Sequence, residues 1–251
     1  MGYAPAPVLN DPLSISRGLV AGMSYVSKFG RNPDVDTGST PEDIWSQGGI
    51  WVPPTTARLH NVVSTSANDT SAGTGARTIT VYGLNGSYVE TSETVTLNGT
   101  TPVATANSYV IIHRALVATA GSGATNAGDI TFTAQTDATI TCAIVAGYAQ
   151  TQLGVYQVPA GKTAYISQVG AGIQGGASAQ GDVCLFIKPF GGVYSLKLEM
   201  SLSVPGSSMV RHVFPVPIAA TAKSLIKLMC TNISSNNTDI HGTFDLVLVD
   251  S

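Results

Sequence analysis

Charged residues are scarce in this sequence. Asp, Glu, Lys and Arg make up 11% of its 251 residues, whereas about a quarter is usual in globular domains. Hydrophobic residues reach 43%, which is too apolar for a disordered chain. A folded protein with so little surface charge is typical of two classes: proteins whose faces are largely covered by neighbouring proteins, and secreted β proteins.

Basic runs and long apolar runs are also missing. The formal net charge is −3 and the Lys and Arg residues are scattered singly, so we expect no nucleic-acid partner. The sequence contains no stretch of eighteen apolar residues, so we expect no membrane-spanning helix. The first residues lack the basic region and apolar core of a signal peptide. We therefore expect a protein made and kept in a cytoplasm until it assembles.

Cysteines are few, odd in number and far apart: Cys142, Cys184 and Cys230. Each lies in an apolar, strand-like run, where a free cysteine acts as a small buried hydrophobe. The histidines are His60, His113, His212 and His241, and none has a metal-binding partner two or four residues away. We expect neither disulfides nor a structural zinc site.

Two short patterns resemble ligand loops only in part. Gly73-Thr-Gly-Ala-Arg77 lacks the Lys and Ser or Thr of a phosphate-binding loop and leads into a strand. Asp34 and Asp36 precede Gly38, as at the start of a calcium loop, but the further oxygen ligands are missing. We interpret both patterns as turns, and the second as a turn that caps itself.

Catalytic patterns are absent as well. No Gly-x-Ser-x-Gly motif marks a nucleophile elbow. Glu90 and Glu93 are three residues apart in a predicted strand, so their side chains point to opposite faces and make a poor acid–base pair. We expect a protein that is not an enzyme and carries no cofactor.

The residues that are present predict strands. From Gly73 to Val117 the sequence is rich in Thr, Val, Ile and Tyr, and Asn85-Gly86 and Asn98-Gly99 separate its runs. Asn-Gly favours the type I′ turn of a hairpin, so the stretch predicts an antiparallel meander. Apolar and polar residues alternate between Val193 and Val204, which is typical of a sandwich strand. We interpret Ser224–Thr231 as a strand as well, and Pro215-Val-Pro217 as a break.

The predicted fold class is all-β, with two β-sandwich (jelly-roll-like) units behind an extended N-terminal arm that contains a short helix. The arm covers residues 1–54, the first unit residues 55–150 and the second unit residues 151–251. Pro5, Pro7 and Pro12 keep the start of the arm extended. Thr40-Pro41-Glu42-Asp43 is the clearest helix start, and residues 14–29 could form a short helix or an irregular arm.

The arm carries both tryptophans of the chain, Trp45 and Trp51. Two interpretations are open. The tryptophans could pin the arm to its own domain, or they could be buried against a neighbouring subunit, since aromatic residues are enriched at the cores of interfaces. On the second interpretation the arm is a clamp that can be removed without unfolding the rest.

Several segments resemble virion structural proteins of tailed bacteriophages of aquatic bacteria, cyanophages among them. They are Gly73–Val81, Ser92–Val103 and Ala118–Ile130, with looser likeness at Phe29–Asp34 and at the turns Val158–Lys162 and Lys188–Gly192. The likeness covers most of residues 29–192. It implies a non-enzymatic β protein displayed in many copies on a phage particle.

Within that class we expect a capsid decoration (cement) protein that stabilises the head by bridging capsid subunits through its arm and exposed sheet edges. Its expected partners are the major capsid protein and copies of itself, as a homotrimer or homodimer. The candidate assembly contacts are Phe29, Arg31, Trp45 and Trp51.

The alternative is a receptor-binding or adhesion component of a tail or head fibre, and a head-completion or tail-tube component comes third. A glycan site would need aromatic residues that converge on one face or loop end. The sequence instead spreads the following tyrosines along its strands: Tyr82, Tyr88, Tyr109, Tyr148, Tyr156 and Tyr194.

Overall fold

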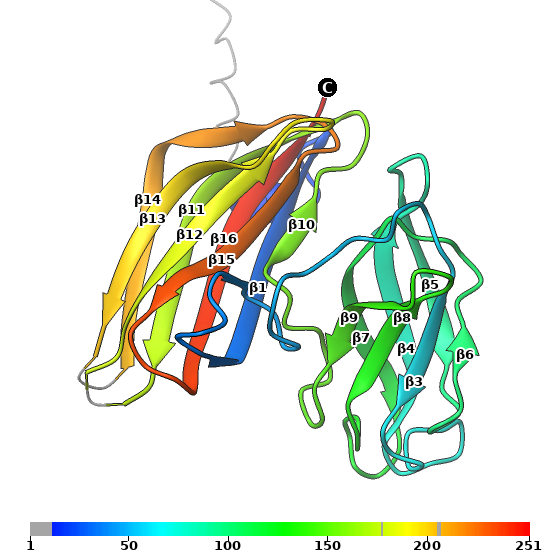
Figure 1. Ribbon diagram of the computed structural model, residues 1–251. Coiled ribbons are helices and arrows are strands. Elements are labelled where there is room, and N and C mark those ends of the chain that lie inside the picture. The colour runs from blue at the N-terminus through cyan, green and yellow to red at the C-terminus, as the bar shows by residue number, and fades with distance from the viewer. Residues whose placement is uncertain (1–11, 177, 205–206) are drawn as a thin grey trace, which may run out of the picture.

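A computed structural model describes residues 12–176, 178–204 and 207–251. They form two β-sandwiches of unequal size that lie side by side (Figure 1). The predicted all-β class with a short helix near the N-terminus is confirmed, and the helix is α1 (Pro12–Ser16). Pro5 and Pro7, which were expected to keep the chain extended, lie outside the described residues.

The large sandwich is built from two antiparallel sheets. One, which we call the β1–β14 sheet, has this order: β1 (Met23–Val35), β16 (Thr238–Asp250), β11 (Lys162–Gln174) and β14 (Ser207–Ala220). The other, the β10–β13 sheet, has this order: β10 (Val155–Gln157), β15 (Leu225–Ile233), β12 (Gln180–Lys188) and β13 (Ser195–Ser203). The two-residue strand β2 (Glu42–Asp43) also pairs with β15.

The small sandwich also has two antiparallel sheets. The first sheet has this order: β6 (Val103–Ala104), β3 (His60–Ser64), β8 (Ile130–Ala134) and β9 (Thr139–Ile144). The second has this order: β5 (Glu90–Thr96), β4 (Ala76–Leu84) and β7 (Ile111–Ala120). All its strands come between β2 and β10, so the small sandwich is an insertion in the chain of the large one.

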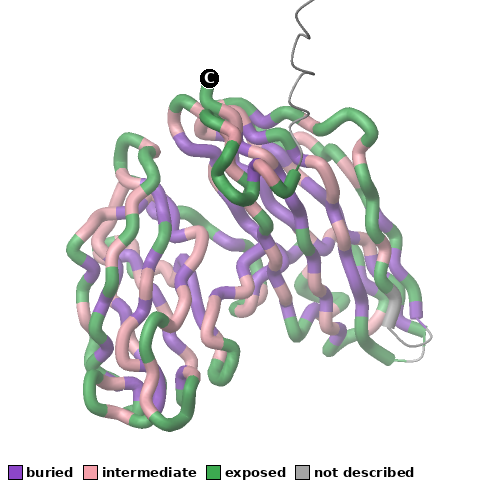
Figure 2. The backbone as a smooth tube through the Cα atoms, turned by 180° about the vertical axis from the view of Figure 1, so that it is seen from behind, coloured by how far each residue is buried: buried purple, intermediate pink, exposed green. Residues whose placement is uncertain are grey.

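Alternation of apolar side chains creates a separate core in each sandwich. In the large sandwich, Phe244, Leu246 and Leu248 of β16 point inward and are fully or almost fully buried. In the small one, Ile79 and Phe132 do the same. Each such side chain contributes about 1.5–3 kcal/mol by leaving water. Figure 2 shows buried positions gathered inside both sandwiches and exposed positions along their rims.

The structure corrects the predicted arm. Residues 23–35 form β1, which pairs with β16 from Met23 opposite Val249 to Val35 opposite Thr238. Gly30 makes this path possible, because a Cβ there would lie 2.1 Å from the Ile44 carbonyl oxygen. The segment therefore belongs to the large sandwich. The helix predicted at Thr40 does not form either, because Glu42 and Asp43 pair with β15 as β2.

The predicted meander is also corrected. Residues after Asn98-Gly99 leave the sheet, and the short strand β6 pairs with β3 in the opposite sheet. Strand β7 then pairs with the other side of β4. Asn85-Gly86 does connect β4 and β5, but through a longer turn in which the Asn85 side chain accepts hydrogen bonds from the amides of Ser87 and Val89.

Strand β15 matches the prediction from sequence, whereas β14 differs from it. Residues 225–233 form β15, as predicted, although their apolar spacing also fits a helix. Pro215 and Pro217 lie within β14, which runs from Ser207 to Ala220, although residues 214–217 have no partners on β11. This strand lies at the edge of its sheet, where the missing amide of a proline leaves no ladder hydrogen bond unmade.

We predict that a chain beginning at residue 37, which lacks β1, loses stability in the large sandwich. Removing β1 exposes the paired edge of β16 and the core residues behind it, so we expect the melting temperature to fall by about 10 °C or more. Thermal unfolding followed by circular dichroism measures this. A chain beginning at Pro12 is the control, and an unchanged melting temperature in the shorter chain would show that β1 is dispensable.

Candidate assembly surface

Both tryptophans are buried within the chain, between the two sandwiches. Trp45 is 6% exposed and Trp51 is 2% exposed. They form one apolar cluster with Leu84 and Ile111 of the small sandwich, and Trp51 Nε1 donates a hydrogen bond of 2.8 Å to the Thr141 carbonyl oxygen. Of the two interpretations, the tryptophans therefore pin the chain to itself, and neither offers a surface to a neighbouring subunit.

A buried ion pair fixes the segment that carries the tryptophans. Lys227 Nζ of β15 lies 2.8 Å from Asp43 Oδ1, and both side chains are almost completely buried. The other carboxylate oxygen of Asp43 accepts a hydrogen bond of 2.8 Å from the Trp51 amide. Burial raises the pKa of Asp43, and Lys227 opposes that rise. Removing one partner would leave the other charge buried alone, which typically costs about 3–5 kcal/mol.

The other two candidate contacts, Phe29 and Arg31, lie on β1. Arg31 makes a bidentate ion pair with Asp239 of β16, with a shortest distance of 2.7 Å, and its other terminal nitrogen donates to the Tyr148 hydroxyl of the small sandwich at 2.9 Å. Phe29 is half-buried opposite Thr243. Arg31 is thus engaged within the chain, at the junction between the sandwiches.

Titratable side chains gather at the same junction. Lys28 is 2% exposed and donates to the His113 carbonyl oxygen. Burial lowers the pKa of Lys28 to about 7, and the charge of Arg114 adds to that effect. Burial, with the charges of Lys28 and Arg114, lowers the pKa of His113 to about 3. The Lys28 amine is buried and its hydrogen bond to main chain helps to hold the sandwiches together, and a cavity of about 390 Å³ lies beside it, lined in part by Lys28 and His113.

Two of the acidic residues considered for chemistry, Glu93 and Asp36, accept hydrogen bonds from main-chain amides. Glu93 accepts hydrogen bonds from the Ala106 and Asn107 amides and from the Tyr109 hydroxyl, while Asp36 accepts one from the Asn237 amide. No three His, Cys, Asp or Glu side chains among the described residues gather as a metal site would require. In that part of the chain no helix has the length and apolar character needed to cross a membrane.

The surface that stands out is the edge of the large sandwich farthest from the small one. There β13 and β14 each pair on one side only, and they lie next to each other (Figure 1). Large apolar side chains are exposed along both strands and the turn before β13: Val193 80%, Leu196 49%, Met209 76%, Val213 56% and Val216 81%. We call these five residues and their two strands the β13–β14 edge.

The alternation of apolar and polar residues along β13 gives no sign that part of this strand is exposed. Leu196, Leu198, Met200 and Leu202 alternate with polar residues along β13, as predicted, but only Met200 and Leu202 are buried. The apolar stripe therefore continues past the end of the core onto the surface. Sequence periodicity cannot locate that limit, because it depends on where the facing sheet ends.

Comparisons with known proteins add little. No protein-family model and no curated protein matches the chain. A solved structure of infectious bursal disease virus Gx strain aligns with 91% of this chain and 76% of its own at 8% identity and a TM-score of 0.26. The Gt strain aligns with 98% and 78% at 11% identity and a TM-score of 0.20. These TM-scores are too low to carry an argument about the fold or role of this chain.

We predict that acid weakens the protein through His113. Its pKa is about 3 when folded and 6.5 when free, so the unfolded chain binds more protons between these values and stability falls as the pH drops below 6.5. The contribution of His113 is about 3 kcal/mol between pH 6.5 and pH 4. Urea unfolding of His113→Phe should show a shallower decline than that of the wild type.

His212→Phe is the matched control, because His212 is an exposed residue of β14. Burial also lowers the pKa of His60 to about 4, so both variants keep the decline that His60 causes. Equal slopes for His113→Phe and His212→Phe would contradict the assignment.

Proposed function

We propose that this chain is a non-enzymatic structural protein of a bacteriophage particle, and that it attaches to the capsid surface as a decoration protein. The observation that carries the proposal is the β13–β14 edge. The resemblance of several segments to virion proteins supports the same role. The proposed partners are the major capsid protein and further copies of this chain.

Exposed apolar edge strands favour association. An edge strand offers unpaired amide and carbonyl groups to any strand that approaches it, and soluble monomers usually protect such edges with charge, bulges or covering loops. Here Arg211 and Lys197 provide some charge, yet the large apolar residues of the β13–β14 edge stay in water. Covering them with a partner would release that hydrated apolar surface.

The two prolines of β14 limit where a partner strand can pair. Pro215 and Pro217 have no amide hydrogen to donate, and residues 214–217 lack partners on β11 as well. A strand that adds to this edge would therefore pair along residues 207–213, and Val216 would make side-chain contact only. Such a modest contact gains strength when it is repeated around a symmetric shell, because each further contact forms at a high effective concentration.

The absence of a catalytic role is part of the proposal. Among the described residues, the acids and histidines considered above are dispersed or bonded to main chain. At the junction of the sandwiches, Lys28 is buried and donates a hydrogen bond to the His113 carbonyl oxygen.

We predict that the double variant Met209→Lys, Val213→Lys abolishes self-association and binding to heads. Two added charges repel each other across a self-paired edge and cannot be buried without a large desolvation cost. Sedimentation velocity gives the oligomeric state, and co-sedimentation with purified heads that lack this chain gives the binding. In the wild type we expect an oligomer, and a copy number comparable with that of the major capsid protein.

The matched control is Ile50→Lys, Val52→Lys, which places the same charges at residues of similar exposure, 48% and 49%, outside the edge. Equal association and head binding by the two double variants would overturn the role of the edge. Absence of the chain from purified particles would overturn the virion assignment itself.

A further inference from the structure

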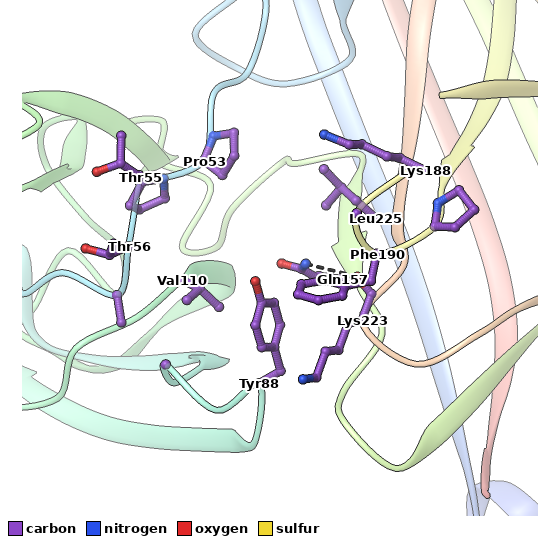
Figure 3. Close-up of a pocket in the computed structure, with 15 residues that line it drawn as sticks. Pro53, Thr55, Thr56, Tyr88, Val110, Gln157, Lys188, Phe190, Lys223 and Leu225 are labelled. Carbon is purple, nitrogen blue, oxygen red and sulfur yellow. Dashed lines mark hydrogen bonds between the residues drawn. The ribbon is translucent and has the colours of Figure 1, made fainter. Parts of the chain in front are cut away.

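A pocket of about 400 Å³ lies between the two sandwiches, near the connection that leads into the small one. The small sandwich and that connection contribute Thr55, Thr56 and Tyr88, and the large sandwich contributes Lys188, Phe190 and Lys223. Figure 3 shows these side chains approaching a common space from the two sides. The volume falls within the range usual for small-molecule sites, about 300–1,000 Å³.

Two aromatic rings from different sandwiches converge here. The rings of Tyr88 and Phe190 meet edge to face, with centroids 5.4 Å apart. Phe190 lies in the turn after β12 and is 60% exposed. The convergence that a glycan site requires is therefore present, although the sequence suggested tyrosines dispersed along strands. The second ring comes from a phenylalanine 102 residues away from Tyr88, which the spacing of tyrosines could not reveal.

The pocket carries positive charge without a compensating acid. Lys188 and Lys223 line it, and the residues that line it include no Asp or Glu. Lys223 Nζ lies 5.0 Å from the centroids of both Tyr88 and Phe190, and Lys188 Nζ lies 5.5 Å from that of Tyr194. Neither lysine belongs to an ion pair within the described residues. Both ammonium groups are thus available to an anion.

The backbone around the pocket is held in an unusual shape. Tyr88 and Lys223 both have a φ of 63°, a left-handed conformation that non-glycine residues rarely adopt and that is concentrated at functional sites. Hydrogen bonds hold both residues: the Lys223 amide donates to the Val158 carbonyl oxygen at 2.9 Å, and the Ala160 amide donates to the Tyr88 carbonyl oxygen at 2.8 Å. The backbone from which the Tyr88 ring and the Lys223 side chain project is therefore fixed by the fold.

We propose that this pocket binds an anionic saccharide, a sugar ring that carries a carboxylate. The exposed Phe190 ring offers a flat apolar surface for the C–H face of the sugar. Lys188 and Lys223 would pair with the carboxylate through charge-assisted hydrogen bonds. The hydroxyls of Thr56 and Tyr88 would bond the sugar hydroxyls, while the Thr55 hydroxyl is already bonded to Asp137. The inference rests on the pocket alone and holds whether or not the β13–β14 edge binds a capsid.

The test is a titration of the full-length protein with glucuronic acid, galacturonic acid and N-acetylneuraminic acid, followed by amide chemical shifts in nuclear magnetic resonance. We expect saturable shifts around Tyr88, Phe190 and Lys223 with at least one of them. Lys223→Gln and Phe190→Ala should each weaken binding about tenfold or more, equivalent to about 1.4 kcal/mol. Circular dichroism confirms that each variant is folded.

Matched variants elsewhere on the large sandwich separate recognition from general effects. Lys162→Gln removes a lysine of β11, and Tyr165→Ala removes an exposed ring of the same strand, so both should bind as the wild type does. Glucose should bind at least about tenfold more weakly than its acid.

Three results would overturn the proposal. They are the absence of saturable binding for all three acids, binding of glucose as tight as that of the tightest-binding acid, and binding of sulfate as tight as that of the same acid, which would indicate a site for any small anion.

Discussion

The buried ion pair between Asp43 and Lys227 determines how this chain is put together. It holds the segment after β2 against β15, and the Trp51 amide, bonded to the same carboxylate, fixes the direction in which the chain leaves. Trp45 and Trp51 then fill the space between the sandwiches. Because this ion pair is deeply buried, replacing either partner would strongly lower the stability of the fold. The pair therefore keeps the small sandwich attached to the large one where it is inserted.

That arrangement makes the two edges of the large sandwich different. At one edge, β1 faces the small sandwich, and contacts such as the Arg31–Tyr148 hydrogen bond and the Lys28 hydrogen bond to the His113 carbonyl oxygen cover it. At the other edge, β13 and β14 remain uncovered and apolar. One edge of the large sandwich is therefore covered and the other is an unpaired apolar edge. A protein of this kind can bind neighbours through one side only, which suits a repeating shell.

Local pattern predicted much of the fold. The alternation along β13 and the all-β class follow from side-chain period and turn residues, which act over short distances. The strand character of residues 225–233 followed from the strands on either side of them, because their own spacing also fits a helix. The features that local pattern could not predict depend on contacts between residues far apart in the sequence. Residues 23–35 were assigned to an arm, yet they form strand β1, whose hydrogen-bond partners lie in β16, more than two hundred residues away. The carboxylates of Glu93 and Asp43 serve amides whose positions only the folded chain defines. Of the four candidate contacts, the two tryptophans are buried and Arg31 is paired within the chain. Part of the exposed edge is formed by the apolar side of β13, which the alternation had assigned to the inside of a sandwich.

The central claim is that the β13–β14 edge is where this protein meets its neighbours in the particle. A cryo-electron microscopy reconstruction of the mature particle, at a resolution that separates strands, tests it directly. The account predicts density for this chain on the capsid surface, with residues 207–213 of β14 against a neighbouring protein and the small sandwich farther from that contact. A chain attached through its small sandwich, with the β13–β14 edge facing solvent, would contradict it.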